Sequence, residues 1–385
     1  MTQPDAPHGI EQLVRDTLVD PRRRLDPPPG HYQTVNARIG RARRRRNSRW
    51  LAAAVGVVAV LAAGGLVMDQ RGTGEGPSTP TSPSTAPSAA APQYAFWRSL
   101  PAIGTGEPVD VAAGDGWFYL LQESPGTVVR LNGRDVTTGA SAPVPDKPEW
   151  LSVDAAADRL WVGYREPTGM AKVREYIAST LAPLRDVPVT DVQVFQSVAV
   201  DGELWTGTAK GLFRIGQGDQ AARPVPGAGE MVFALALDPT RHRLLMDSPT
   251  GVNALDPGTL AVTQGARLNF VKESIAVVSG QVWVGGYTSG QDRRIYHLDP
   301  VTLQVTGTSP INDQVGPGAI LAAGVSSLWV RGGADDTVSC LDPASGAVLR
   351  QWRRAGGPIV SLPGIALTVS PPNLYQLALG DGCAG

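Results

Sequence analysis

The stretch "DGELWTGTAKGLFRI", from Asp201 to Ile215, contains a small turn, an apolar run around Trp205, a glycine-containing reversal and a second alternating run. Alternation of apolar and polar residues between turn-forming residues is typical of short β-strands. Related runs recur along the chain as "DRLWVGY" at 158–164, "GQVWVGG" at 280–286 and "SSLWVRG" at 326–332. The recurrence indicates one structural unit that is repeated several times.

When these runs are aligned on their large residue, the repeat has a period of roughly 40 residues, which is typical of a β-propeller. The aligned positions are Trp117, Trp161, Trp205, Leu245, Trp283, Trp329 and Leu367. Each unit is predicted to hold four strands, the first rich in small aliphatic residues because innermost strands converge on the axis. No such sheet can bury its faces alone, so neighbouring units must pack together. We therefore predict an all-β domain, a seven-bladed β-propeller, over residues 94–385.

The connections from third to fourth strands contain a repeated Leu-Asp-Pro motif. It occurs in "LDPGTLAV" at 255–262, "LDPVTLQV" at 298–305 and "LDPASGAV" at 341–348. Proline fixes φ at a turn, and an Asp side chain there can accept hydrogen bonds from nearby backbone N–H groups. The motif therefore predicts the same turn in three blades.

The seventh unit lacks a fourth strand, because the chain ends soon after "LYQLALG" at 374–380. The segment "YAFWRSLPAIG" at 94–104 matches "AVLRQWRRAGG" at 347–357 in character and in its position before a first strand. We predict that Tyr94 to Leu100 supplies the missing strand. Closing the ring in this way leaves no long open sheet edge.

Single units resemble known propeller repeats. "DGELWTGTAKGLFRI" is similar to the repeat of periplasmic sensor domains of two-component regulators, and "LDPASGAVLRQW" at 341–352 resembles a quinoprotein-type repeat. The wider pattern resembles streptogramin-lyase-like propellers. Together these resemblances cover about residues 94–385 and imply the fold, but they imply no particular activity, because propellers include enzymes and binding proteins alike.

Residues 50–68, "WLAAAVGVVAVLAAGGLVM", carry no charge and are long enough for one transmembrane helix. The Arg-rich residues 40–49 before them predict an N-terminus in the cytoplasm and an extracytoplasmic C-terminal domain. We interpret the segment as an uncleaved signal anchor; a cleaved signal peptide is the alternative, although its apolar core is usually only about 7–15 residues. Residues 69–93, rich in Pro, Ser, Thr and Ala, are predicted to form a disordered linker. A glycosylated stalk across a cell wall is the alternative for this linker.

Residues 1–49 are predicted to form a basic cytoplasmic tail, with eleven Arg against five acidic residues. Two short helices are expected from apolar residues at helical spacing. The first stripe is Ile10, Leu13, Val14 and Leu18, and the second, weaker one is Tyr32, Val35 and Ile39. The layout resembles the tails of single-pass actinobacterial membrane proteins, including some anti-sigma proteins, but the tail has no Cys and so lacks their zinc-binding motif. It is interpreted either as a docking segment for a cytoplasmic partner or as a segment lying on the inner leaflet.

Catalytic and cofactor motifs are scarce in this sequence. It has four His and two Cys, and it contains no GxSxG, Walker, HExxH or CxxC motif. The streptogramin-lyase resemblance implies a metal held by His and Glu, but His242 falls in a turn and His297 in a third strand, so we interpret both as structural or surface residues. No metal site and no cofactor is predicted. A nucleic-acid partner is not expected either, because 22 basic and 28 acidic residues from Tyr94 onward leave a net charge of −6.

Cys340 and Cys383 fall in the third strand of the sixth unit and after the third strand of the seventh. Adjacent blades can bring them together, so a disulfide is one prediction in an oxidising compartment. The alternative is a buried Cys340 beside a free Cys383.

A ligand site is expected where loops precede first strands and follow second strands. The candidate residues there are Trp150, Tyr164, Arg165, Phe233, Lys272, Glu273, Tyr287, Arg331 and Asp335. Surface loops carry such residues in any case, so each can also be an ordinary loop residue. The sequence favours a membrane-anchored, extracytoplasmic binding or sensing module for a protein, peptide or cell-wall glycan. The alternatives are a tethered propeller enzyme, such as a lyase or hydrolase, and a structural envelope scaffold.

Overall fold

The computed structural model describes residues 97–385, apart from gaps at 101–102, 104–105, 146, 191–192, 230, 250, 266, 269, 288–292, 310–319, 325, 333–336, 354–356, 378–382 and 384–385. The predicted tail, transmembrane helix and linker, residues 1–93, lie outside the described residues. Within the described part, no helix is long and apolar enough to cross a bilayer.

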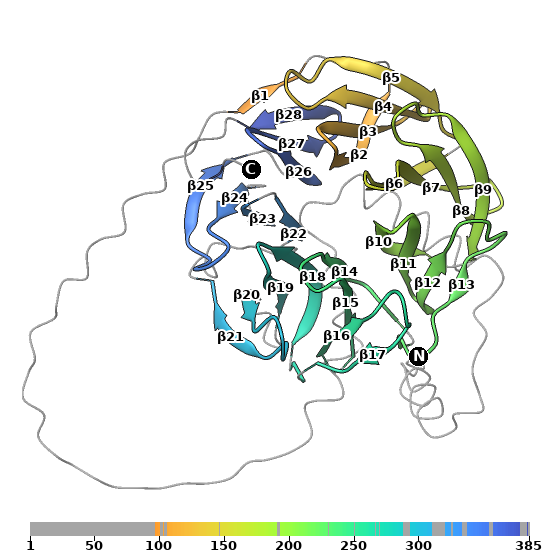
Figure 1. Ribbon diagram of the computed structural model, residues 1–385. Coiled ribbons are helices and arrows are strands. Elements are labelled where there is room, and N and C mark those ends of the chain that lie inside the picture. Colours follow the sequence, from red (N-terminus) through yellow and green to blue (C-terminus); the bar gives the residue numbers. More distant parts are fainter. Residues whose placement is uncertain are drawn as a thin grey trace, which may run out of the picture. The chain divides into compact units, whose positions relative to one another are not determined.

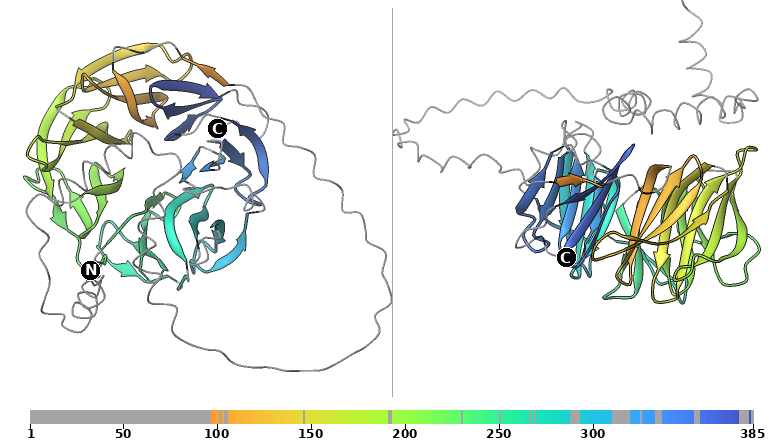
Figure 2. Two further views of the ribbon diagram at one scale, coloured as in Figure 1. Left: turned by 180° about the vertical axis from the view of Figure 1, so that it is seen from behind. Right: turned by 90° about the horizontal axis from the view of Figure 1, so that it is seen from above.

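Seven four-stranded antiparallel sheets, the blades, are arranged in a ring (Figures 1 and 2). Blade 1 contains β2 (Glu107–Gly114), β3 (Trp117–Glu123), β4 (Thr127–Asn132) and β5 (Thr138–Pro143), and blade 2 contains β6 (Lys147–Asp154), β7 (Arg159–Arg165), β8 (Ala171–Ile177) and β9 (Pro183–Thr190). Blade 3 contains β10 (Val194–Val200), β11 (Glu203–Thr208), β12 (Gly211–Ile215) and β13 (Arg223–Pro224), and blade 4 contains β14 (Leu235–Asp238), β15 (Arg243–Ser248), β16 (Gly251–Leu255) and β17 (Val262–Thr263). Blade 5 contains β18 (Val271–Val278), β19 (Gln281–Tyr287), β20 (Arg293–Leu298) and β21 (Val305–Thr308), and blade 6 contains β22 (Ile320–Ala323), β23 (Leu328–Gly332), β24 (Thr337–Leu341) and β25 (Val348–Trp352). Blade 7 contains β26 (Ile359–Leu362), β27 (Ile365–Ser370), β28 (Asn373–Leu377) and β1 (Trp97–Ser99). The predicted seven-bladed propeller is confirmed in the described region.

The ring closes by the predicted exchange of a strand from the other end of the domain. β1 pairs antiparallel with β28, so that Trp97 lies opposite Leu377 and Ser99 opposite Tyr375. The indole of Trp97 packs edge-on against Tyr375, with ring centroids 4.6 Å apart, and its Nε1 donates to the Arg353 carbonyl at 2.8 Å. Blade 7 therefore has four strands.

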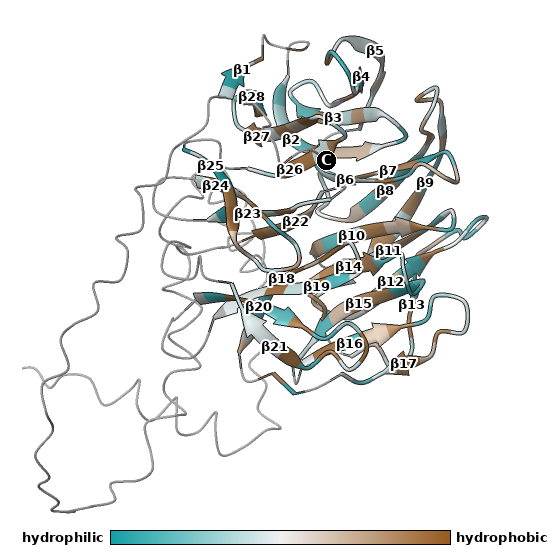
Figure 3. Ribbon diagram, turned by 60° about the vertical axis from the view of Figure 1, so that its left-hand side comes forward, coloured by the Kyte–Doolittle hydropathy of each residue, from teal (hydrophilic) through white to brown (hydrophobic). Residues whose placement is uncertain are grey.

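Large side chains of the second strands fill the space between neighbouring blades. Trp161, Trp205, Trp283 and Trp329 are all fully buried. Each packs against apolar residues of the following blade; Trp283, for example, shares a cluster with Leu328 and Leu341 of blade 6. In Figure 3, where residues are coloured by hydropathy, hydrophobic residues recur along the strands of the blades.

The alignment of blade 1 on Trp117 is wrong by two residues. The equivalent residue is Tyr119, which faces Ala112 as Trp161 faces Ser152 in blade 2. Trp117 stands at the first position of β3, half-exposed, with the Arg130 guanidinium 3.7 Å from its ring centroid. In blade 1, as in blade 2, the residue buried between blades is the third one of the second strand, here Tyr119. An alignment on tryptophan residues places Trp117 there instead.

The Leu-Asp-Pro motifs form the same turn, as predicted. The carboxylate oxygen Oδ1 of Asp299 accepts the backbone N–H groups of Val301 and Thr302 at 2.9 and 2.7 Å. Asp256 and Asp342 accept the corresponding pairs in their blades. These hydrogen bonds favour the ionised form and lower the pKa of all three carboxyl groups.

Cys340 in β24 and Cys383 beyond β28 are joined by a disulfide, with their Cα atoms 6.1 Å apart. Both residues are fully buried, in a cluster that also contains Trp329 and Trp352. The bond therefore connects blade 6 to the chain that leaves blade 7, next to the seam of the ring.

Candidate functional site

Antiparallel strands place the connections of every blade at two opposite ends of the ring. We call the end with the connections after second and fourth strands the loop face, and the end with those after first and third strands the turn face. The predicted ligand-site residues that the structure describes lie in β6, β7, β18, β19 and β23 and in the loop before β14, on or toward the loop face.

Phe195 and Phe233 pack together on the loop face of blades 3 and 4, and Met231 precedes Phe233 by two residues in the same loop; we call these three residues the apolar patch. Phe233 precedes β14, and its ring centroid is 4.5 Å from that of Phe195 in β10. Phe233 and Met231 remain 42% and 40% exposed, whereas the large residues between blades are buried. Such exposed aromatic and Met side chains are typical of the centres of protein interfaces.

Asp247 in β15 holds the backbone beneath this patch. Its Oδ1 accepts the N–H groups of Phe233 and Ala234 at 2.7 and 2.9 Å, and its own N–H donates to the Ala234 carbonyl at 3.0 Å. Burial raises the pKa of Asp247, and these hydrogen bonds together with the positive charge of Lys272 oppose the rise. The position of Phe233 is therefore set by a neighbouring strand.

Lys272 in β18 is the second predicted residue brought to this place. The residue is 6% exposed and Asp247 is 5% exposed. Burial lowers the pKa of Lys272, and the negative charge of Asp247 opposes the change. The positive charge of Lys272, in blade 5, thus acts on the Asp247 carboxylate that positions Phe233. Asp247 was not among the residues predicted from the sequence, although an acidic residue near the end of the largely apolar run "RLLMDS" at 243–248 was a usable signal.

First strands of blades 1, 3 and 5 carry a polar residue directly after a β-bulge, and each bonds to the first strand of the next blade. Asp110 Oδ2 accepts from Leu151 N at 3.0 Å. Gln196 and Ser274 accept likewise from Leu235 N and Leu321 N, both at 3.1 Å. These side chains join neighbouring blades near the axis. Their role could not be predicted from the alternation of apolar and polar residues, because a bulge shifts that alternation by one residue.

Trp150 occupies the same position after a bulge in blade 2. It is half-buried, and its indole covers Gly163 so closely that a Cβ there would lie 2.0 Å from the ring. The structure thus places Trp150 against its own sheet.

Two further predicted residues of blade 2 are engaged within that blade. Tyr164 is buried and hydrogen-bonds to Asp186; burial, the main cause, and the negative charge of Asp186 raise the Tyr164 pKa well above its usual range. Arg165 binds the two carboxylate oxygens of Glu149 at 3.1 and 3.2 Å and donates to the Gly169 carbonyl at 2.9 Å. Tyr164 therefore connects β7 to β9, and Arg165 connects β7 to β6.

The remaining candidates are not brought together with the apolar patch by any described contact. Glu273 and Arg331 are half-buried near the loop-face ends of β18 and β23. Tyr287 ends β19, and Asp335 lies outside the described residues.

No group of three or more His, Cys, Asp or Glu among the described residues is placed to hold a metal ion. The ring of His297 stacks on Trp283 at 4.5 Å, and its Nε2 lies 2.7 Å from Oε1 of Gln281. Burial lowers the pKa of His297. His242 lies in the turn between β14 and β15, where its Nε2 is 3.0 Å from Oδ2 of Asp201.

Comparison with known proteins shows the fold and no family. No protein-family model and no curated protein matches the chain. Solved structures similar to it include the β-propeller domain of Cps50 (Swd1) from Myceliophteria thermophila, with 11% identity, a TM-score of 0.57 and coverage of 74% of this chain and 100% of that one. The WD40 repeats of RRP9 match with 8% identity, a TM-score of 0.58 and coverage of 75% and 99%. The WD40 β-propeller domain of Doa1 matches with 15% identity, a TM-score of 0.55 and coverage of 75% and 98%. At such low identity these likenesses establish a β-propeller fold alone.

Proposed function

We propose that this chain is a protein-binding propeller whose partner, a protein or peptide, contacts the loop face through the apolar patch of Phe195, Met231 and Phe233. The exposed ring of Phe233, which packs against Phe195 in a tilted arrangement and follows a backbone held by Asp247, is the observation that carries the proposal. A rigid, preorganised aromatic side chain loses little entropy on binding and is typical of interface hot spots. WD40-type propellers among the structural neighbours favour the same role.

Photo-crosslinking in cells tests this proposal. A photoreactive phenylalanine analogue at position 233 is expected to capture a discrete protein, which mass spectrometry then identifies. The matched control is the same analogue at Leu184, which is 46% exposed but lies near the turn-face end of the outer strand β9. Phe233→Ala should weaken binding of the captured protein at least about tenfold, as removal of a hot-spot residue does, and Leu184→Ala should leave it unchanged. Identical capture patterns at both positions would contradict the proposal.

We place this module outside the cytoplasm on a single membrane anchor. The uncharged residues 50–68 and the preceding Arg cluster support this placement. Protease added to intact cells should then remove the domain after Gln93 and spare the tail. The reverse pattern, a protected domain and a digested tail, would invert the proposed topology.

A further inference from the structure

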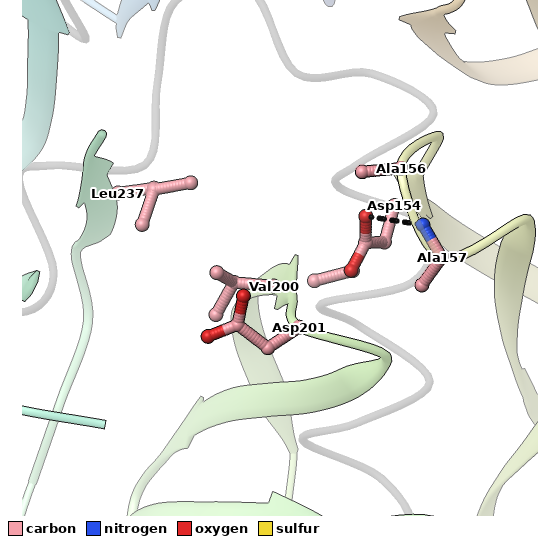
Figure 4. A pocket seen from close by; sticks show the side chains of 7 residues that line it. Asp154, Ala156, Ala157, Val200, Asp201 and Leu237 are labelled. Carbon is pink, nitrogen blue, oxygen red and sulfur yellow. Dashed lines mark hydrogen bonds between the residues drawn. The ribbon is translucent and has the colours of Figure 1, made fainter. Parts of the chain in front are cut away.

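A cavity of about 370 Å³ opens on the turn face, the end opposite the apolar patch (Figure 4). It lies where the first strands of blades 2, 3 and 4 end. Its lining residues are Asp154, Ala156, Ala157, Ala199, Val200, Asp201 and Leu237. The volume is within the range of about 300–1,000 Å³ that is usual for sites of small ligands.

One side of the cavity is built around the rigid carboxylate of Asp154. This residue is 8% exposed, and its oxygens Oδ1 and Oδ2 accept the N–H groups of Ala157 at 3.2 Å and Gly202 at 2.7 Å. The two donors belong to the turns of blades 2 and 3, so the carboxylate connects the blades and is held in one position. Both oxygens of Asp154 accept backbone hydrogen bonds, so we expect this carboxylate to attract a cation through its negative charge and not to act as a metal ligand.

The second carboxylate, that of Asp201, is accessible. Its side chain is 57% exposed, and its described partner is Nε2 of His242 at 3.0 Å. Asp201 and Gly202 both have left-handed backbone angles, φ of 56° and 73°, which form the type I′ turn favoured by Asp-Gly. The turn holds Asp201 in the lining of the cavity, and Figure 4 shows its side chain next to that of Val200.

The other lining side chains are aliphatic and carry no positive charge. Leu237 of blade 4 stands across from the alanines of blade 2, with Val200 between them (Figure 4). A ligand that fits both parts needs an apolar stem and a cationic head. The side chains of Lys and Arg have this construction, because a chain of methylene groups carries the charge at its end.

We propose that this cavity binds a Lys or Arg side chain of a basic peptide, with its cationic head at Asp201 and Asp154 and its methylene stem against Leu237 and Val200. The site is separate from the loop face, so it can be tested without reference to the apolar patch. It would allow the propeller to hold two segments at opposite ends of its axis.

Equilibrium binding to the full-length chain tests the proposal, with Nα-acetyl-lysine methylamide as the probe. Nα-acetyl-norleucine methylamide, which has the aliphatic chain but no ammonium group, is the matched control ligand. We expect the lysine probe to bind at least about fivefold more tightly, since hydrogen bonds to charged groups are the stronger class. The difference should shrink as salt is added, because screening weakens exposed charge pairs.

Asp201→Asn should abolish the preference for the lysine probe. Asn is well suited to type I′ turns, so this variant keeps the turn. Asp115→Asn is the matched control, because Asp115 starts the equivalent Asp-Gly turn of blade 1 and does not line the cavity. The proposal is overturned by equal affinity for both probes, by no measurable binding of the lysine probe, or by a preference that persists in Asp201→Asn.

Discussion

The indole of Trp283 fills the space that a side chain at position 346 would need: a Cβ on Gly346 would lie 2.6 Å from Cη2 of Trp283. Gly346 is the left-handed residue of the turn after β24, and Trp283 Nε1 donates to the Pro343 carbonyl of the same turn at 2.9 Å. The equivalent left-handed turn positions of blades 1, 2, 4 and 5 hold Val136, Leu181, Leu260 and Leu303. These aliphatic side chains pack against the preceding blade. In blade 6, glycine leaves that space to the tryptophan of blade 5.

Gly346→Ala should therefore destabilise the domain more than a left-handed glycine replaced in open space. Gly116 provides that comparison, since its φ of 71° is close to the 69° of Gly346 and no atom lies within 4 Å of its Cβ position. Both variants suffer the left-handed strain of about 1–2 kcal/mol. Gly346→Ala should lose a further 1–3 kcal/mol or so from overpacking against Trp283. Urea denaturation measures both, and equal losses would show that the indole moves aside without cost.

Removal of β1 should prevent stable closure of the ring. A chain that begins at Glu107 lacks the strand paired with β28 and exposes the apolar surface covered by Trp97 and Leu100. Trp97 and Leu100 are half-buried, so each contributes less than the roughly 1.5–3 kcal/mol of a fully buried side chain. Together with the lost β1–β28 pairing this is still a sizeable share of a net stability of about 5–15 kcal/mol. The truncated chain should aggregate or melt well below a chain that begins at Gln93.

The same closure predicts a specific cross-link. Arg98 and Gln376 are directly opposed in the β1–β28 pair, so cysteines placed at these two positions should form an intramolecular disulfide. Gel mobility with and without reductant detects it. If no cross-link forms and the truncated chain melts with the longer one, blade 7 is closed in another way.

The Cys340–Cys383 disulfide should stabilise the seam of the ring. It closes a loop with a sequence separation of 43 residues, for which about 2–4 kcal/mol is expected. Replacing both cysteines by Ala should lower the melting temperature, and adding reductant should lower that of the natural chain by a similar amount. Reductant should leave the Ala variant unchanged, and a shift in that variant would assign the effect to something other than this bond.

The buried pair Asp247 and Lys272 predicts a pH-dependent variant. Burial raises the folded-state pKa of Asp247, so its favourable contribution is full below about pH 3.9 and is lost as the pH rises through the folded value. Burial lowers that of Lys272, so its contribution is full above about pH 10.4 and is lost as the pH falls through its folded value. Near neutral pH, burial therefore disfavours the charged form of both groups, and the charge of each stabilises the charged form of the other.

Lys272→Met should leave the Asp247 carboxylate without its nearby positive charge and destabilise the protein at pH 8 by roughly 1–2 kcal/mol, since one pKa unit of lost charge interaction is about 1.4 kcal/mol. The loss should shrink as the pH falls through the Asp247 pKa, because the carboxyl group protonates and Met fits an apolar site better than an ammonium group. Lys147→Met, at an exposed position that begins β6, is the control. Chemical denaturation at pH 4 and pH 8 measures the difference, and an equal loss at both would refute the coupling.

Features that depend on a few neighbouring residues could be predicted from the sequence alone. The Asp-Gly turn at Asp201 and the hydrogen bonds of Asp299 follow from local turn chemistry. The strand pattern and the closure by β1 follow from a repeat in which one unit lacks a strand. The role of Trp117 could not be predicted in this way. Its residue type suggested the buried position between blades, which Tyr119 occupies instead.

Contacts between blades were decided only by the tertiary structure. Phe233 and Lys272 were chosen from the sequence, but Asp247, which connects them, was not, and Trp150 and Tyr164 face their own blade. The cavity at Asp154, Asp201 and Leu237 combines three blades that are separated by about a repeat length along the chain. The physical reason is that a repeat determines each sheet locally, whereas side chains of different sheets meet only through the rotation that packs one blade against the next.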